Sequence, residues 1–446
     1  MGNAKHTRRE WWLIFSAGFA AFGAYFCMYA FRKPFTAATY AGVAEISGLD
    51  FKVALVIAQM LGYALSKFIG IKVISELRPG RRAFFFLGLM VFAELALIGF
   101  GLVEGHWTAL LMLFLNGLPL GIIWGIVFSY LEGRRTTELL SAMLCVSFIV
   151  SSGAVKSVGR WIMQDIWAGP QVQGMFWMPA MTGALFFLPL LGFIYWLQML
   201  SPPTPQDVAA RSERAPISRA ERWQLLRRLG PGLIGIVLYY VLITAFRDVR
   251  DNFGTELWTA LGYGDAPAIF TLAELPIAVL ALGTLVLGYF IKNNRAALRY
   301  YHALIVGSTL LVIISTLAFS AGRLDGAYWM VLVGLGLYLG YVPLNAIYFD
   351  RLIGAFREVA TAGFLIYVAD ASGYAGSVGV LLLKNLGGLE VSWLTFFVGL
   401  AYVAGGFGLL FAVLSWWAFE RRLAKHCSPS GLKHLIFAPY PPGGVS

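Results

Sequence analysis

The sequence predicts an all-α integral membrane protein with twelve transmembrane helices, arranged as two six-helix halves. Of its 446 residues, 59% are hydrophobic and only 13% are charged, whereas soluble domains contain about 25% charged residues. Apolar segments of roughly 20 residues, the length that spans a bilayer as a helix, recur along nearly the whole chain. This composition excludes a soluble enzyme, a secreted disulfide scaffold and a nucleic-acid-binding domain.

Twelve apolar segments are long enough to form the predicted spans. The first follows Lys5, Arg8 and Arg9, as a secretory signal would. Its apolar stretch is longer than the ~7–15 residues of a signal peptide, so we expect it to be retained. The predicted spans are residues 11–33, 54–75, 83–103, 107–130, 138–160, 176–197, 231–250, 268–291, 298–320, 326–349, 359–383 and 393–419.

The longest break between spans divides them six and six. It contains Ser201-Pro-Pro-Thr-Pro205 followed by six arginines. Such a proline-rich, basic segment without an apolar face is typical of a solvated linker, with room for one surface helix. The predicted organisation is an N-terminal six-helix bundle (1–197), a cytoplasmic linker (198–230), a C-terminal six-helix bundle (231–420) and a cytoplasmic tail (421–446).

The basic residues are distributed asymmetrically about the predicted spans. If the N-terminus is cytoplasmic, 23 of the 34 Lys and Arg lie in cytoplasmic segments and at most seven lie in segments on the opposite side. Membrane proteins concentrate Lys and Arg in cytoplasmic loops, so this bias places both termini in the cytoplasm. It also explains the net charge of +11 without a nucleic-acid partner.

An internal repeat supports the division into two halves. Tyr25 and Ala30-Phe-Arg32 match Tyr240 and Ala245-Phe-Arg247 at a constant offset of 215 residues. Short basic connections also recur after the second and eighth spans. Two parallel halves related by an axis along the membrane normal are the major facilitator architecture, in which the substrate lies between the halves near the bilayer midplane.

The repeated arginines are the most informative charged residues. Tyr25, Tyr29 and Arg32 are spaced i, i+4, i+7 and share one helical face, as do Tyr240, Thr244 and Arg247. If the first helix continues past Pro34 toward Tyr40, Arg32 lies well inside the membrane. Two facing guanidinium groups repel each other unless a multivalent oxyanion lies between them, and the planar guanidinium fork matches phosphate. This pattern predicts a phosphorylated or dicarboxylate substrate.

Other ionisable residues lie inside the predicted spans, where each costs roughly 2.5–3.5 kcal/mol and usually serves a function. Lys67 is either a third cavity cation or a lysine reaching the interface, and Lys156 either pairs with a carboxylate or contacts substrate. Asp370 either balances the cations or carries a proton, and Glu274 and Glu94 are weaker cases of the same kind.

The segment Arg247-Asp-Val-Arg-Asp251 allows a different interpretation of the second arginine. Its two aspartates are close enough in sequence to neutralise the arginines locally, and Arg247 and Asp251 have the i, i+4 spacing of a helical ion pair. The sequence leaves open whether Arg247 faces substrate or pairs with Asp251.

No cofactor or metal site is expected from the sequence. Cys27, Cys145 and Cys427 follow no metal or redox spacing, and we interpret them as free thiols. The five histidines form no metal cluster, no nucleophile–base pair is apparent, and no Gly-x4-Gly-Lys-Ser/Thr loop is present. We therefore expect neither an enzyme nor an ATP-driven pump.

The first two spans resemble a known family. Tyr25-x3-Tyr29-x2-Arg32-Lys33-x-Phe35 and Gly62-Tyr63-Ala-Leu-Ser66-Lys67 resemble helix signatures of the organophosphate:phosphate antiporters, a branch of the major facilitator superfamily. The resemblance is specific over about residues 11–135. It implies that Arg32 and Arg247 bind the phosphoryl group, and that Tyr25, Tyr29 and Lys67 line the path. We also predict Lys33, Lys156 and Tyr240 as substrate-binding residues. The histidine typical of the fifth span in that family is missing here.

These observations predict a secondary transporter in a bacterial inner membrane. We expect it to move a small phosphorylated or multiply anionic metabolite by alternating access, in exchange for inorganic phosphate, and to act as a monomer in the lipid bilayer. Two alternatives remain open: a proton-coupled symporter of an organic anion, with Asp370 or Glu274 as the carrier, and a membrane sensor that binds a phosphorylated metabolite without transporting it.

Overall fold

The structure, a computed structural model, is all-helical over the residues it describes, which are 8–102, 105–132, 134, 136–202, 207, 219–356, 362–389 and 391–426. Twelve helices in these ranges have 21 or more residues: α1 (Arg8–Tyr29), α2 (Phe51–Glu76), α3 (Arg82–Leu102), α4 (His106–Leu131), α5 (Thr137–Trp161), α6 (Gln171–Gln198), α8 (Arg219–Asn252), α10 (Ile269–Tyr289), α11 (Asn294–Ser320), α12 (Gly326–Ala346), α14 (Ala362–Leu386) and α15 (Trp393–His426). Shorter helical segments are η1 (Pro34–Ala37), η2 (Pro79–Arg81), η3 (Ile162–Ile166), α9 (Gly254–Ala260) and α13 (Tyr348–Phe356).

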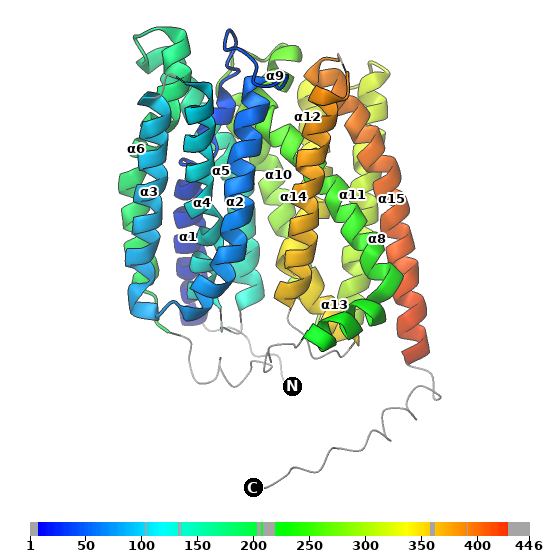
Figure 1. Cartoon of the computed structure of the whole chain (residues 1–446). Helices are drawn as coiled ribbons and strands as arrows, with labels where there is room; N and C mark the ends of the chain where they lie inside the picture. Colours follow the sequence, from blue (N-terminus) through cyan, green and yellow to red (C-terminus); the bar gives the residue numbers. More distant parts are fainter. Residues whose placement is uncertain are drawn as a thin grey trace.

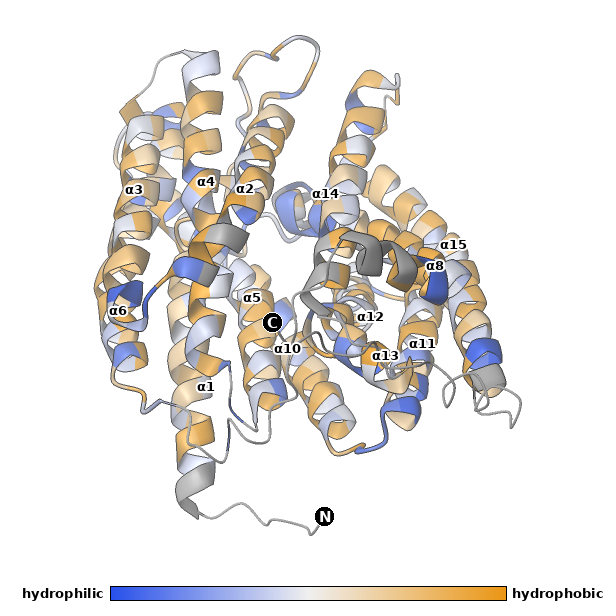
Figure 2. Ribbon diagram, turned by 60° about the horizontal axis from the view of Figure 1, so that its bottom comes forward, coloured by the Kyte–Doolittle hydropathy of each residue, from blue (hydrophilic) through white to orange (hydrophobic). Residues whose placement is uncertain are grey.

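The long helices form two groups that lie side by side (Figures 1 and 2). In one group α4 packs on α2 and α3, and α1 packs on α5 and α6. In the other, α8 packs on α14 and α15, and α12 packs on α10 and α11. The widest contact between the groups joins α5 to α10, with smaller contacts of α2 with α14 and of η1 with α9. We call these groups the N-terminal and C-terminal bundles.

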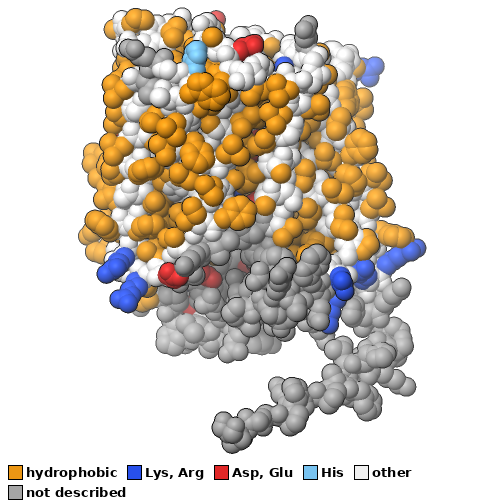
Figure 3. Space-filling model, viewed as in Figure 1, with side chains coloured by type: hydrophobic (Ala, Val, Ile, Leu, Met, Phe, Trp, Pro, Cys, Tyr) orange, Lys and Arg blue, Asp and Glu red, His pale blue; other side chains and the backbone are white. Residues whose placement is uncertain are grey.

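The outer surface is that of a multi-pass membrane protein. Large apolar side chains point outward, among them Leu188 at 75% exposure and Val279 at 69%. Figure 3 shows hydrophobic side chains over most of one face, with Lys and Arg gathered near its lower edge, where α1 begins and α15 ends. Eleven helices in the described ranges are long and apolar enough to cross a membrane, and α14 completes the set of twelve long helices.

The first helix is shorter than the sequence suggested. α1 ends at Tyr29, a hydrogen-bonded turn covers Ala30–Lys33, and η1 starts at Pro34, so the expectation that the helix continues past Pro34 toward Tyr40 is wrong. Pro34 cannot donate a backbone hydrogen bond to the Ala30 carbonyl oxygen, and its ring clashes with that carbonyl in a regular helix, which explains the break after Tyr29. Arg32 therefore projects from a turn between two buried segments rather than from a regular helix.

The long break and the tail are only partly described. The described chain resumes at Arg219 as the start of α8, which is kinked at Gly230, where φ is +45° and Pro231 follows. Arg219–Leu229 thus forms a short helical segment before the span, within the expected linker, whereas Arg211 and Arg214 lie outside the described residues. α15 continues to His426, and the rest of the expected tail, with Cys427, also lies outside them.

Close packing of α4 on α2 positions residues that line the interior. A Cβ atom at Gly117 would overlap the Gln59 carbonyl oxygen, and one at Gly121 would lie 2.5 Å from the Tyr63 carbonyl oxygen. Small residues let membrane helices approach closely without a loss of packing. The two glycines therefore bring α4 against the stretch of α2 that carries Gln59 and Tyr63.

Candidate substrate-binding site between the bundles

The backbone around Arg32 is fixed by two buried amides. Because α1 breaks inside the protein, carbonyl groups near its end need partners other than helical N–H groups. Asn116 on α4 donates to the carbonyl oxygens of Phe31 (3.0 Å) and Ala93 (3.1 Å), and Gln59 on α2 donates to the Arg32 carbonyl oxygen (2.9 Å). Gln59 also donates to the Asn116 side chain at 2.8 Å. This network holds the turn that carries Arg32.

The Arg32 guanidinium is surrounded by aromatic rings. Its central carbon lies 3.9 Å from the centre of the Tyr63 ring and 5.6 Å from that of Tyr29, and Tyr29 in turn contacts Tyr25 at 5.6 Å between ring centres. Among the described residues, no carboxylate lies within ion-pair distance of Arg32, and its Nε is buried without a hydrogen-bond partner. Cation–π contacts stabilise a desolvated guanidinium by roughly 2 kcal/mol but do not neutralise it.

Arg247 differs from its repeat counterpart, because it has a local carboxylate. Its Nη2 lies 2.6 Å and its Nε 3.1 Å from Oδ1 of Asp248, and the other oxygen of Asp248 accepts a hydrogen bond from Ser377 at 2.7 Å. The guanidinium also lies 4.1 Å from the centre of the Tyr341 ring. The expectation of two unneutralised arginines therefore holds for Arg32 only, and the pairing of Arg247 is with Asp248 rather than Asp251.

Lys67 and Asp370 form an ion pair between the bundles. Lys67 on α2 donates to Asp370 on α14, and Tyr240 on α8 donates to the other oxygen of the same carboxylate. Tyr374, one turn along α14 from Asp370, packs against Tyr63 at 5.7 Å between ring centres. The Lys67 ammonium lies 5.3 Å from the centre of the Tyr63 ring and 5.0 Å from that of Tyr374. Lys67 and Arg32 thus share the ring of Tyr63.

A second set of ion pairs lies near the end of α8, close to η1 and to α9, which is at the top of Figure 1. Asp251 on α8 is paired with two cations of the N-terminal bundle, Lys33 and Lys156, each at 2.5 Å. Ser152 on α5 donates to the same carboxylate, and Lys33 also donates to Asn252 at 2.8 Å. Asp251 therefore joins three elements, with only 12% of its side chain exposed.

Glu274 and Arg250 form a pair inside the C-terminal bundle, 2.6 Å apart, with Arg250 also donating to the Met330 carbonyl oxygen. The structure thus places every predicted site residue in the interior. It engages Lys33, Lys67, Lys156, Arg247, Asp370 and Glu274 in ion pairs, leaves Arg32 among tyrosines, and buries Tyr25, Tyr29 and Tyr240 beside them.

Several residues that shape the site are not among the predicted site residues. Gln59 and Asn116 are carboxamides inside apolar spans, and such residues indicate buried backbone groups that need partners. No repeat or motif in the sequence marks Tyr341. The sequence presents Asp251 only as a neighbour of Arg247, whereas in the structure it bridges the two bundles.

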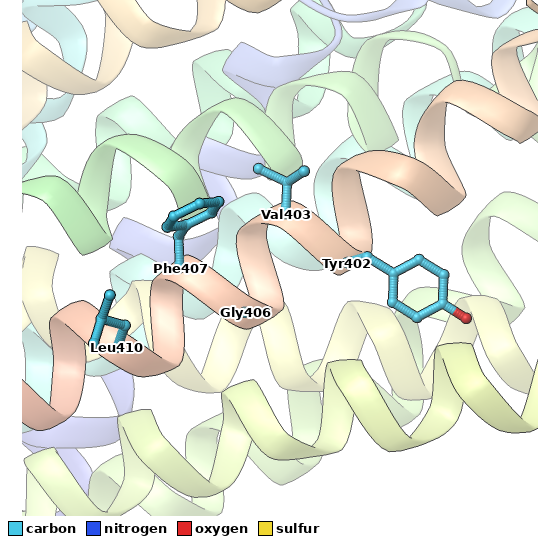
Figure 4. A pocket seen from close by; sticks show the side chains of 5 residues that line it. All are labelled: Tyr402, Val403, Gly406, Phe407 and Leu410. Atoms are coloured by element: carbon cyan, nitrogen blue, oxygen red, sulfur yellow. The ribbon is translucent and has the colours of Figure 1, made fainter.

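The pockets on the outer surface do not belong to this site. One, of about 380 Å³, lies on α15 and is lined by Tyr402, Val403, Gly406, Phe407 and Leu410 (Figure 4). Another, of about 810 Å³, lies near the start of α4 and includes His106 and Trp177. Within the described residues no group of three His, Cys, Asp or Glu side chains is arranged to hold a metal, and Cys27 and Cys145 are free and buried.

Comparison with solved structures identifies the fold. A bacterial homologue of the human lysosomal transporter Spinster, inward-facing and occupied, aligns with a TM-score of 0.62 and 13% identity over 96% of this chain and 100% of that one. A D-xylose–proton symporter aligns with a TM-score of 0.60 and 14% identity over 90% and 96%. The nucleoside transporter NupG aligns with a TM-score of 0.59 and 12% identity over 90% and 98%. The fold is that of major facilitator transporters.

Sequence comparison places the chain in a family. A search of curated proteins found no match. Residues 34–422, from the start of η1 to near the end of α15, match the family of unknown function DUF5690. The match begins after α1, Arg32 and Lys33. The chain therefore belongs to the family of unknown function DUF5690 and has the major facilitator fold.

Proposed function

We propose that this protein is an alternating-access secondary transporter that moves a small, multiply charged anion, with a phosphorylated metabolite as cargo and inorganic phosphate as the exchanged ion. The fold supports the transporter part, because its structural neighbours are transporters. The charges between the bundles support an anionic cargo. The need to neutralise those charges whenever the protein changes conformation supports exchange for phosphate.

The observation that carries the proposal is the state of Arg32. Arg32 is partly buried, and a partly buried guanidinium among aromatic groups without a carboxylate is costly, because its desolvation is not repaid. Tyr29 and Tyr63 present ring faces to it, and no described carboxylate pairs with it. A phosphoryl group supplies both the negative charge and the hydrogen-bond acceptors that the guanidinium lacks.

The balance of charges between the bundles points the same way. Six cations line the region and four carboxylates pair with them: Arg32, Lys33, Lys67, Lys156, Arg247 and Arg250 against Asp248, Asp251, Glu274 and Asp370. The cations exceed the carboxylates by two because Arg32 has no carboxylate and two lysines share Asp251. A dianion such as a phosphate monoester would balance the region.

The same surplus supports exchange rather than uniport. An empty site keeps its uncompensated positive charge during the conformational change that switches access from one side of the membrane to the other, and this charge opposes the change. A site that holds either inorganic phosphate or the organic phosphate is neutralised and changes conformation more easily. Lys67 and Asp370 come from different bundles, so an anion that drew Lys67 away from Asp370 would also loosen the contact between them. We propose that this coupling makes the reorientation depend on bound anion.

The distribution of Lys and Arg indicates how the protein is oriented in its membrane. Most of the described Lys and Arg outside the interior lie near the end of the molecule where α1 begins and α15 ends, and the positive-inside bias assigns that end to the cytoplasm. We accordingly propose a bacterial inner membrane with both termini cytoplasmic. A single chain contains the complete site, which supports a monomer as the working unit.

The experiment that tests the proposal is phosphate counterflow. The protein is reconstituted in vesicles loaded with unlabelled phosphate, and uptake of labelled phosphate is followed with no pH gradient. We expect labelled phosphate to accumulate transiently, and phosphorylated metabolites in the external medium to compete with it. Binding of phosphate by the purified protein without counterflow would instead favour the sensor, and uptake only with an imposed proton gradient would favour the symporter.

A further inference from the structure

One ionisable side chain of the membrane interior takes no part in the ion pairs described above. Glu94 lies near the middle of α3, and its carboxyl group occupies the space beside Gly183 on α6, where a Cβ atom would overlap its Oε2. That oxygen is buried and has no hydrogen-bond partner among the described residues. No described Lys or Arg lies within ion-pair distance of Glu94.

The helices around Glu94 offer very few charges. α6 contains no charged residue between Gln171 and Gln198, and α3 has only Arg82, at its start, besides Glu94. α4 has only His106, also at its start. The first charged residue after α1 is Arg32, in the turn before η1. An ionised carboxylate at Glu94 would thus have no Lys or Arg within ion-pair distance among the described residues.

Glu94 is connected to that turn by backbone and amide contacts. The carbonyl oxygen of its neighbour Ala93 accepts a hydrogen bond from Asn116, which also binds the Phe31 carbonyl oxygen. The Phe31 ring itself reaches the same space at Gly183 as the Glu94 carboxyl group. A change in charge at Glu94 would therefore act on the segment that positions Arg32.

We propose that Glu94 is a proton-binding site, protonated in the state described here, and that its proton is linked to anion binding at Arg32. A neutral carboxylic acid fits an apolar space between α3 and α6, whereas a carboxylate there would have no counter-ion and would disturb the neighbouring Phe31 segment that positions Arg32 for the anion. Proton and anion thus bind cooperatively, and by linkage each raises the affinity for the other. The linkage rests on the proposed anionic cargo, but the proton site does not.

Infrared spectroscopy of the purified protein tests the proton site without any ligand. As the pH is raised, we expect the wild-type protein to lose the carbonyl absorption band of a protonated carboxylic acid. The loss is seen as a negative band when the low-pH spectrum is subtracted from the high-pH spectrum. Glu94→Gln, which preserves the shape of the neutral acid, should lack this band, and Glu94→Asp should retain a pH-sensitive band. The matched control is Glu45→Gln, at an exposed carboxylate in the loop before α2, and it should leave the band unchanged. A Glu94→Gln spectrum identical to that of the wild type overturns the proposal.

Sulfate binding tests the linkage, because sulfate remains a dianion throughout the neutral pH range and any pH dependence then belongs to the protein. We expect wild-type affinity to rise by at least about 5-fold from high to low pH. Glu94→Gln should bind with the low-pH affinity at every pH. Equal pH dependence in both proteins contradicts the linkage. If neither protein binds sulfate, the anionic cargo fails, and the infrared result still decides the role of Glu94.

Discussion

At the scale of single residues, the function depends on the geometry of Arg32. We expect Arg32→Lys to weaken phosphate binding by about 10- to 100-fold, because an ammonium group cannot form the bidentate contact and a charge-assisted hydrogen bond contributes about 1.5–3 kcal/mol. Isothermal titration with phosphate measures the effect, and counterflow should fall with it. The matched control is Arg323→Lys, at an exposed position between α11 and α12, and wild-type affinity in Arg32→Lys would contradict the assignment.

Arg247 is expected to respond less strongly to the same change. Its guanidinium is already neutralised by Asp248, so it contributes less of the uncompensated charge. We expect Arg247→Lys to weaken phosphate binding less than Arg32→Lys does, in the same titration. Equal losses at the two positions would show that the pair with Asp248 opens when anion binds and that both arginines contact the cargo.

The Tyr63 ring is a second determinant at this scale, because it holds the guanidinium of Arg32 at 3.9 Å. We expect Tyr63→Leu to weaken phosphate binding about tenfold, since a desolvated cation–π contact is worth about 1–2 kcal/mol and 1.4 kcal/mol corresponds to tenfold. Tyr63→Phe keeps the ring and should bind nearly as the wild type. If the phenylalanine variant loses as much affinity as the leucine variant, the hydroxyl group rather than the ring matters.

At the scale of elements, the broken end of α1 depends on the amides of α2 and α4. Asn116→Ala leaves the carbonyl oxygen of Phe31 without a partner and removes one acceptor of Gln59. We expect a loss of about 1–3 kcal/mol, because this is the cost of a buried polar group without a partner. Thermal unfolding in detergent checks this against Asn385→Ala, which removes one hydrogen bond near the end of α14. Equal thermal unfolding midpoints for Asn116→Ala and Asn385→Ala would show that the Asn116 hydrogen bonds contribute no special stability.

The elements also show what the sequence could reveal and what it could not. The spans follow from apolar length, and the equivalence of Arg32 and Arg247 follows from the repeat, because both are local patterns. The partners of the charges are not local: Lys67 and Asp370 are 303 residues apart, and Lys156 and Asp251 are 95 apart. A single substitution between the repeats, Lys33 against Asp248, also gives Arg247 a counter-ion that Arg32 lacks.

At the scale of the whole molecule, the ion pairs between the bundles have a consistent polarity. Toward η1 and α9 the N-terminal bundle supplies the cations and the C-terminal bundle the carboxylates, as in Lys52–Glu256 and the two lysines on Asp251. At the opposite end the roles reverse, with Glu138 on α5 and Arg351 on α13. Ion pairs between the bundles are thus present toward both ends among the described residues, and we expect alternating access to require each set to open in turn.

The pair at the upper end gives the clearest test of alternating access. Lys52 has only 1% of its side chain exposed, so Glu256→Gln leaves a buried ammonium without its carboxylate, which costs the closed state about 3–5 kcal/mol. Ala37 is fully buried, and its carbonyl oxygen accepts a hydrogen bond from Thr255 across the same contact. A cysteine placed at Ala37, in a chain whose native cysteines are replaced by alanine, should react with a membrane-impermeant maleimide only when this contact opens. Because about 3 kcal/mol corresponds to roughly 100-fold in population, we expect labelling to accelerate by about that factor in Glu256→Gln.

Three controls make this result specific. Glu45→Gln removes an exposed carboxylate and should leave labelling slow, and a cysteine at the exposed Thr39 should react quickly in every background. Lys52→Gln together with Glu256→Gln removes both charges and should restore much of the protection, since the penalty comes from the unpaired lysine rather than from the missing pair. Equally fast labelling in the single and double variants would show that the side chains seal the entrance by packing. Slow labelling in Glu256→Gln would mean that the entrance is held by Asp251 and its two lysines, or that this end does not open.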